Sequence, residues 1–200
     1  MESKEKYRDI SAADIKTLIS NNCTCEDWNR VLVTEEFDPS RCHNVTFSGD
    51  VRLGAFRKAF TDASGVSYKS GISNAHVHNC TIGSDVLICN IGDYVANYTV
   101  EDDVVIRNCG KVHTEGMSSF GNGTEVAVLT ESGGRSVRIW DRLSAHQAYI
   151  TALYRHRYKT LAKLSRMVSD YTGSVSSETG TICSGTRIFD CRNIRNVKFG

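Results

Sequence analysis

The chain has 200 residues, with 24 basic and 23 acidic side chains and a formal net charge of +1. Near-neutral charge excludes an electrostatic clamp for nucleic acid or an acidic membrane, and 40% hydrophobic content excludes wholesale disorder. No apolar run approaches the roughly 18 residues of a membrane-spanning helix, and the polar start has no signal-peptide core. We therefore expect a cytoplasmic protein that binds neither nucleic acid nor membrane.

Residues 1–36 are predicted to form a helical cap. Ser11 and Asp14 have the spacing of a capping box, and Leu18 belongs to the apolar stripe that follows. Asn21 is expected to end this helix, and Thr24–Asp27 to start a further helical turn. Such a segment would cover the apolar end of whatever stacks next to it.

Residues 37–112 carry a periodic pattern. Valines recur every nine residues in part of this segment, and apolar residues open successive blocks of six. The agreement is best at the common multiple, 18, as in the pairs Asn79/Asn97, Ile82/Val100, Val86/Val104, Ile88/Ile106 and Asn90/Asn108. The pattern predicts coils of about 18 residues stacked one strand spacing apart, with Asn and Gly columns at the corners. An ordinary meander with accidental periodicity is the alternative.

Residues 113–180 are predicted to be an insertion. Two strands, Glu125–Thr130 and Ser136–Trp140, should form a hairpin around Gly133-Gly134, followed by one long helix over residues 141–171. The repeat resumes in residues 181–200, where Thr181-Ile182-x-Ser184 matches Thr81-Ile82-x-Ser84. Because this last coil has no polar cap, we expect the natural protein to continue or another element to cover it.

The predicted long helix has six basic side chains against two acidic ones, and Arg155, Arg157 and Lys159 are the basic residues nearest its middle. One interpretation is a solvated face. A second is contact with a small anionic ligand, such as the phosphates of a donor, or with an acidic partner. A membrane-surface helix is the third, and its interrupted charge makes it the weakest.

Eight cysteines suggest a disulfide framework by number alone. However, Cys109 falls in the 18-residue column of Ile91, and Cys191 is its counterpart in the resumed coil. Cysteine in an apolar column behaves as a small hydrophobic residue. The sequence therefore predicts packing cysteines rather than disulfides.

The six-residue pattern, with Ile82-Gly83 and Val100-Glu101 opening blocks, resembles the hexapeptide repeat of left-handed parallel β-helices. General topology favours right-handed crossovers, so the handedness comes from the resemblance alone. The fold class expected is thus mainly β, a left-handed parallel β-helix with a helical cap and a hairpin-plus-helix insertion. Trimers are typical of the resembled enzymes, which makes a homo-oligomer an expectation.

In hexapeptide-repeat acyltransferases a histidine on the coil surface acts as general base, and His113 is the first candidate here, with Glu115 to orient its ring. His78 is a second candidate, expected two coils, about 10 Å, from Thr114. Gly121 and Gly123 are expected to bring backbone N–H groups close to a phosphate or pantetheine. For each histidine, a plain surface or turn residue is the alternative.

A metal site is not expected. Left-handed β-helix carbonic anhydrases hold zinc with three histidines, and the resemblance would use His76 and His113. Ser118 stands where the third histidine would be.

Longer stretches resemble one large, uncharacterised bacterial family: FDPSRCHNVTFSGDVRLG (37–54), HNCTIGSDVLICNIGDYVANY (78–98), SSFGNGTEVAVL (118–129) and AYITALYRHR (148–157). That family looks like the β-helix region of sugar-nucleotide pyrophosphorylases and acetyltransferases, and this chain looks like its N-terminal part. The resemblance implies a transferase-like protein acting on a nucleotide sugar or an acyl donor such as acyl-CoA, without a resident cofactor. A non-catalytic β-helix scaffold or binding module is the alternative.

Overall fold

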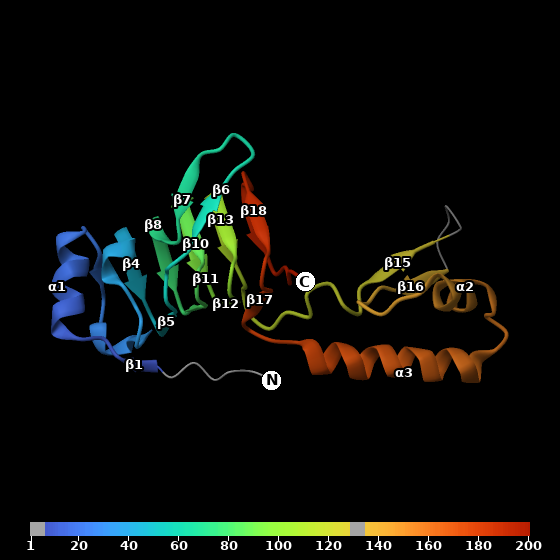
Figure 1. Ribbon diagram of the computed structural model, residues 1–200. Coiled ribbons are helices and arrows are strands. Elements are labelled where there is room, and N and C mark those ends of the chain that lie inside the picture. Colours follow the sequence, from blue (N-terminus) through green and yellow to red (C-terminus); the bar gives the residue numbers. More distant parts are fainter. Residues whose placement is uncertain (1–6, 129–134) are drawn as a thin grey trace. The chain divides into compact units, whose positions relative to one another are not determined.

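The computed structural model describes residues 7–128 and 135–200, which form two compact units (Figure 1). The first, called the β unit, consists of the residues up to Glu115 together with Thr179–Gly200. The second, called the inserted unit, is Gly116–Glu178. The described residues are mainly β, with three α-helices and, in the β unit, parallel sheets that curl.

Two large sheets make up most of the β unit. The first has the order β1-β3-β5-β9-β12-β17. Its strands are β1 (Tyr7–Asp9), β3 (Val31–Thr34), β5 (Val51–Leu53), β9 (Thr81–Ile82), β12 (Tyr98–Val100) and β17 (Gly180–Ile182). β1 pairs antiparallel with β3, and the later pairs are parallel.

The second sheet has the order β18-β13-β10-β8-β11-β14-β19, with β4 beside β8 and β2 beside β4. Its strands are β2 (Thr24–Cys25), β4 (Cys42–Ser48), β8 (Gly71–His78), β10 (Leu87–Ile91), β11 (Val95–Ala96), β13 (Val105–Cys109), β14 (Lys111–His113), β18 (Arg187–Phe189) and β19 (Asn193–Arg195). Its pairs are parallel, and Figure 1 shows β8, β10, β13 and β18 lying side by side.

The predicted stacking at 18 residues is confirmed in several pairs. Ile88 pairs with Ile106, and Thr81 with Thr99. One step is shorter, because Ala96 pairs with His113 rather than with Thr114. The chain between the corner at Asn108 and β14 is therefore one residue shorter than the corresponding stretch in the preceding coil.

Three apolar columns fill the interior of the β unit. The first is Cys42, Ile72, Ile88, Ile106 and Ile188; the second is Val33, Leu53, Ile82, Val100 and Ile182; the third is Phe47, Val77, Val95, Val112 and Ile194. Their side chains are between 0% and 7% exposed. Each large apolar side chain buried in this way contributes roughly 1.5–3 kcal/mol, so the columns are the main stabilising feature of the unit.

The expected packing role of cysteine is confirmed at several of these positions. All eight cysteines lie among the described residues and are free thiols, and Cys42, Cys80 and Cys109 are buried. Cys191 is partly buried and packs against the same core.

The corners of the coils carry residues with positive φ. One set of corner side chains forms a ladder in which each amide donates to the next residue's side-chain oxygen, over 2.8–3.3 Å. This asparagine ladder runs Asn22, Asn44, Asn74, Asn90, Asn108 and Asp190, and all six have φ between 51° and 59°. Asn tolerates this left-handed conformation, which explains the Asn columns of the sequence.

Residues at the start of the β unit fold partly as predicted. Helix α1 (Ala12–Ser20) begins with the capping box, in which Asp14 N–H donates to Ser11 Oγ (3.1 Å), and Leu18 is fully buried. The further helical turn expected from Thr24–Asp27 is wrong in part. Thr24 and Cys25 pair with β4 as β2, and Asp27 caps the short 3-10 helix η1 (Trp28–Arg30). A second 3-10 helix, η2 (Pro39–Arg41), precedes β4.

A hairpin inside the coil region was not predicted. β6 (Ala59–Thr61) and β7 (Ser67–Lys69) pair antiparallel, and Phe60 and Tyr68 pack on the outer face of the sheet against Leu87, Cys89 and Val105. The hairpin lengthens its coil, so that Cys42 pairs with Ile72, 30 positions later. A period of 18 could not reveal this pairing.

The inserted unit contains β15 (Glu125–Ala127), β16 (Ser136–Arg138), α2 (Ala145–Leu153) and α3 (Tyr158–Val175). The two strands pair antiparallel as predicted, over shorter ranges, and Gly133-Gly134 lies outside the described residues. The single helix over residues 141–171 is wrong, because the chain leaves helical conformation between α2 and α3. A straight helix of that length would extend about 45 Å, whereas the break lets Ala152 and Val168 both be buried in one small unit. No helix in the described part of the chain is long and apolar enough to cross a membrane.

Candidate functional site

An outward column of polar side chains on the second sheet brings two of the predicted residues together. Phe47, Val77, Val95, Val112 and Ile194 point inward, so the residues that follow them point outward, because side chains alternate along a strand. These outward residues are Ser48, His78, Ala96, His113 and Arg195. With His76 and Glu115 they are called the histidine face.

The two histidines that the sequence offered as candidate bases flank a small residue. His78 pairs with Ala96, and Ala96 pairs with His113, which puts the backbones of the two histidines about 10 Å apart, two strand spacings. The prediction that His78 lies two coils from Thr114 is therefore wrong by one residue, because of the short step after Asn108. Ala96 is the smallest side chain of the column and is 6% exposed.

At one end of the histidine face, a serine hydroxyl bridges two imidazoles. Ser48 Oγ lies 2.9 Å from His76 Nε2 and 2.8 Å from His78 Nδ1. The second ring nitrogen of His78, Nε2, lies 2.9 Å from Asn79 Nδ2. Both nitrogens of His78 are thus engaged.

The hydrogen-bond network assigns a direction to these contacts. Asp50 N–H donates to Asn79 Oδ1 over 2.9 Å, so the amide nitrogen of Asn79 faces His78 and donates to its Nε2. Neutral His78 then carries its proton on Nδ1 and donates to Ser48 Oγ, and the Ser48 hydroxyl donates to His76 Nε2. Ser48 is held with its proton directed at an imidazole, the arrangement that activates a hydroxyl.

Gly49 makes this network sterically feasible. Its φ is +63°, and a Cβ there would lie 2.0 Å from Asn79 Oδ1 and 3.2 Å from His78 Cε1. A larger residue would displace the amide that fixes the His78 ring. Ser48, Gly49 and Asn79 were not predicted as site residues, since their contacts join coils separated by the unforeseen hairpin.

His113, at the other end of the face, is less open than predicted. Its side chain is 13% exposed, and it meets the Tyr94 ring edge to face at 5.6 Å. Its Nδ1 is buried and has no hydrogen-bond partner among the described residues. The ring can therefore engage other groups mainly through Nε2.

Glu115 does not hold His113 in the way expected. The closest approach, Nε2 to Oε2, is 4.0 Å, longer than a hydrogen bond, whereas Arg195 Nη2 lies 2.9 Å from Glu115 Oε2. Arg195 pairs with His113 in the sheet, and nothing local in the sequence pointed to it.

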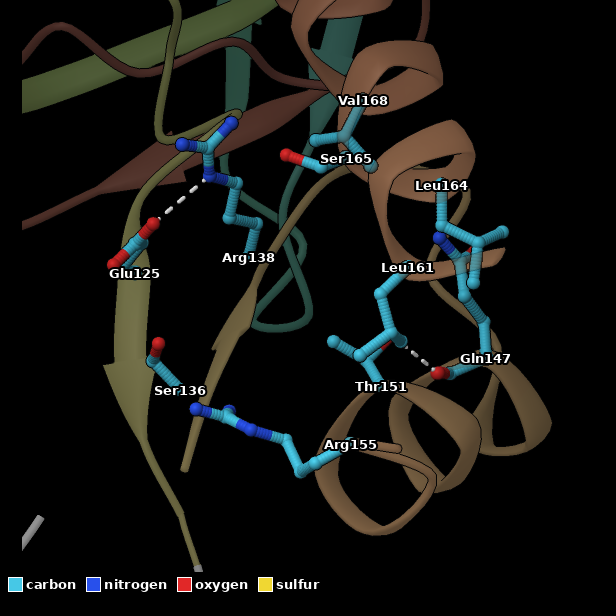
Figure 2. Close-up of a pocket in the computed structure, with 10 residues that line it drawn as sticks. All are labelled: Glu125, Ser136, Arg138, Gln147, Thr151, Arg155, Leu161, Leu164, Ser165 and Val168. Atoms are coloured by element: carbon cyan, nitrogen blue, oxygen red, sulfur yellow. Dashed lines mark hydrogen bonds and ion pairs between the residues drawn. The ribbon is translucent and has the colours of Figure 1, made fainter. Parts of the chain in front are cut away.

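The inserted unit holds the residues expected to bind a ligand. A cavity of about 180 Å³ lies between the hairpin and the two helices, and Figure 2 shows Arg155 and Arg138 among the residues lining it. Arg138 is engaged by Glu125 (3.0 Å) and by Ser169 Oγ (3.0 Å). Arg157 and Lys159 are exposed and do not line the cavity.

Gly121 and Gly123 have roles in the fold of the inserted unit. Both have positive φ, +87° and +85°, in the turn that precedes β15. The Gly123 N–H donates to the Ile139 carbonyl over 2.8 Å, and a Cβ at this position would lie 2.9 Å from Thr172 Oγ1. The N–H of Gly123 is therefore already used within the protein.

The fold and the histidine face define a mainly β protein of stacked parallel strands with a polar, imidazole-rich outer column. The chain belongs to the family described as a domain of unknown function, DUF4954, whose model matches residues 7–200. An uncharacterized protein from Treponema pallidum (strain Nichols) is 26% identical over 210 residues. The match covers 100% of this chain and 29% of that relative, and no solved structure matches the chain.

Proposed function

We propose that the β unit is a left-handed parallel β-helix of the hexapeptide-repeat type, and that its histidine face is a transferase-like site for an acyl donor or a sugar nucleotide. The fold part of this proposal is supported by the three apolar columns and by the corner columns of positive φ. Coils with three short faces and turns at regular intervals are what a six-residue repeat would produce.

One observation carries the catalytic part. His78 and His113 belong to one outward column and flank Ala96, and hydrogen bonds to Ser48 and Asn79 fix the His78 ring. His113 would be the base, since its Nε2 is the nitrogen that is not enclosed. It would take a proton from an acceptor hydroxyl or amine as that group attacks the donor. In acyl transfer the new bond forms to the thioester carbonyl carbon, the C–S bond breaks, and the proton passes to the departing thiolate.

The other predicted residues have secondary parts in this proposal. His78 would position rather than take protons, because both of its ring nitrogens are engaged. Glu115 would stabilise a protonated His113 from 4.0 Å while remaining paired with Arg195. Arg155, Arg157 and Lys159, all exposed, would attract an anionic ligand to the inserted unit. Eight free thiols support a reducing location such as the cytoplasm.

A non-catalytic binding module is the second candidate. It is favoured by the partial enclosure of His113 and by the pairing of Glu115 with Arg195, which leaves no carboxylate hydrogen-bonded to the ring among the described residues. In this case the histidine face would bind a partner without changing it, and the same column would be a recognition surface.

The test measures thiol release from acetyl-CoA with amino-sugar acceptors, alongside thermal-shift binding of acetyl-CoA and UDP-sugars. His113→Ala is expected to lower the rate by about 10²–10⁴-fold, the usual contribution of a general base. His156→Ala is the matched control, since that imidazole is exposed in the inserted unit. Equal rates in wild type and His113→Ala would show that His113 is not the general base. Absence of turnover and of stabilisation by every donor would favour the binding module.

A further inference from the structure

We infer that Ser48 is a nucleophile that takes up a short acyl group from an uncharged carboxylic ester, with His76 as its base. This reaction makes one end of the histidine face a site of ester hydrolysis. Ser48, His76 and His78 are each partly exposed, so the reacting groups lie at the surface rather than in the core. The reaction does not use His113, and the inference therefore does not depend on the proposed function.

Four hydrogen bonds in a row point in one direction and end at His76. The Asp50 N–H donates to Asn79 Oδ1, and Asn79 Nδ2 donates to His78 Nε2, each over 2.9 Å. His78 Nδ1 then donates to Ser48 Oγ (2.8 Å), and the Ser48 hydroxyl donates to His76 Nε2 (2.9 Å). Because each group in the chain already accepts from the one before it, the Ser48 proton is directed at His76.

The two histidines have different parts in the reaction. His76 accepts on Nε2, so this nitrogen takes the proton of the Ser48 hydroxyl when the oxygen attacks. His78 presents an N–H to the same oxygen, and this donor lies closest to the negative charge that develops on an attacked carbonyl. Asn79 keeps the His78 proton on Nδ1 by donating to Nε2, which makes it a positioning residue.

The reaction consumes only an ester and water. Ser48 Oγ forms a bond to the carbonyl carbon while its proton passes to His76 Nε2. The bond between that carbon and the leaving alkoxide breaks, and protonated His76 gives its proton to the alkoxide. Water then attacks the acyl carbon and loses a proton to His76. The acyl bond to Ser48 breaks, and the proton returns to its hydroxyl as the carboxylic acid departs.

The surroundings of Ser48 favour an uncharged ester with a short acyl group. Cys25 pairs with Phe47, so the exposed Glu26 stands beside Ser48, one strand spacing away. A carboxylate next to the nucleophile repels an anionic donor such as an acyl-CoA. The nearest outward residues on β4 and β8 are Thr46 and the two histidines, all polar, so a long apolar chain would gain little there.

The experiment mixes the whole chain with p-nitrophenyl acetate, and it measures p-nitrophenol release and, by peptide mass spectrometry, acetylation of Ser48. We expect a burst of p-nitrophenol stoichiometric with the protein. Ser48→Ala should abolish the burst and the acetylated peptide, and His76→Gln should slow acetylation about 10²–10⁴-fold. Ser67→Ala is the matched control, since the exposed Ser67 hydroxyl meets Thr61 Oγ1 (3.0 Å) rather than an imidazole.

Two further measurements separate the nucleophile from the fold. Ser48→Cys keeps a nucleophile of similar size and should still be acetylated at position 48, as a thioester. In wild type the rate of acetylation should rise with pH between about 5 and 8, the range in which an imidazole changes charge. His76→Gln should lose this rise, which a purely structural role of His76 would leave in place.

Acetyl groups on lysine or histidine side chains but not on Ser48 would overturn the inference, as would equal bursts in wild type and Ser48→Ala. His113→Ala should keep the full burst, because that imidazole has no part in the reaction at Ser48. Loss of the burst in His113→Ala, with Ser48→Ala unaffected, would also overturn the inference and would assign ester cleavage to His113. Failure of the transferase proposal and failure of this inference are thus distinguishable.

Discussion

The two units of this protein bury their apolar residues in different ways. In the β unit each coil places its apolar side chains on those of the next coil, so columns such as Ile72, Ile88 and Ile106 are completely enclosed. In the inserted unit the described residues bury only Val137, Ala152 and Val168 among apolar side chains. Repetition thus produces a continuous core, whereas a hairpin with two helices has too little surface to enclose one.

The exposed apolar residues show the same contrast between the two units. Of 13 large hydrophobic residues exposed among the described positions, nine belong to the inserted unit: Met117, Val126, Ile139, Tyr149, Ile150, Leu153, Tyr154, Tyr158 and Met167. We therefore expect the β unit to contribute most of the stability.

The stability of each unit can be measured separately, because the two tryptophans lie one in each unit, Trp28 in the β unit and Trp140 in the inserted unit. Trp28→Phe and Trp140→Phe each leave a reporter for one unit.

The largest effect is expected for a cavity in an apolar column. Ile88→Ala should lower the free energy of unfolding of the β unit by about 2–5 kcal/mol, because Ile88 is fully enclosed between neighbouring coils. Val168→Ala in the inserted unit should cost less, since it removes fewer atoms at a less enclosed site. Urea unfolding followed by Trp28 and by Trp140 checks the comparison. A larger loss for Val168→Ala would show that the inserted unit has the tighter core.

Alkaline pH should destabilise the β unit selectively. Burial raises the pKa of the Cys80 thiol from 9.0 to about 12, and it also raises the pKa of Cys109 and of the Tyr98 hydroxyl. The unfolded chain ionises these groups first, so the stability present below pH about 9 is lost as the pH rises toward 12. All eight cysteines belong to the β unit.

The measurement is the urea midpoint reported by Trp28 between pH 8 and 11, in the presence of a reducing agent. Cys80→Val should flatten the decline, while the midpoint reported by Trp140 should change less over the same range. An equal decline at both tryptophans would mean that the buried thiols are not the cause.

A smaller effect is expected at the asparagine ladder. Asn90→Ala removes two ladder hydrogen bonds and puts a residue with a Cβ at φ +56°, where alanine is strained. The expected loss is roughly 1–2 kcal/mol of unfolding free energy. Asn90→Gly removes the same hydrogen bonds but tolerates the backbone angle, and should lose less. Equal losses of unfolding free energy in the two variants would mean that strain at the positive φ of position 90 does not destabilise the alanine variant.

The smallest effect is expected at an exposed ion pair of the inserted unit. Arg138 Nε lies 3.0 Å from Glu125 Oε1, with both side chains more than a third exposed. Arg138→Gln should cost less than about 1 kcal/mol, and 1 M salt should reduce the difference from wild type. Unfolding reported by Trp140 checks this. A loss above that of Asn90→Ala would show that the inserted unit relies on polar contacts rather than on its small core.

The sequence predicted those parts of the molecule that repeat. The columns through Ile82 and Ile88 follow directly from the spacing of 18, and the capping box at Ser11 follows from local side-chain geometry. The hairpin between β6 and β7 was missed because it interrupts the period, and the break before α3 was missed because the apolar pattern runs through it. In each case a tertiary contact, not a local preference, decides the conformation.

The candidate site could be predicted only in part, for the same reason. His78 and His113 were chosen as surface residues near a common register, and the sheet pairs both with Ala96. Ser48 could not be found, since the hairpin moves it out of the 18-residue register with His78. Arg195 could not be predicted either, because it forms its ion pair with Glu115 only after the chain returns from the inserted unit.

The asparagine ladder gives the β unit a specific sensitivity to chemical ageing. Each amide nitrogen donates in the same direction along the stack, from Asn22 toward Asp190, where a carboxylate accepts the last bond. Deamidation of an interior member such as Asn74 would replace its donor with an oxygen facing the oxygen of Asn90. One such event would turn an attraction between neighbouring coils into a repulsion, so slow loss of ammonia from these side chains would weaken the stack one coil boundary at a time.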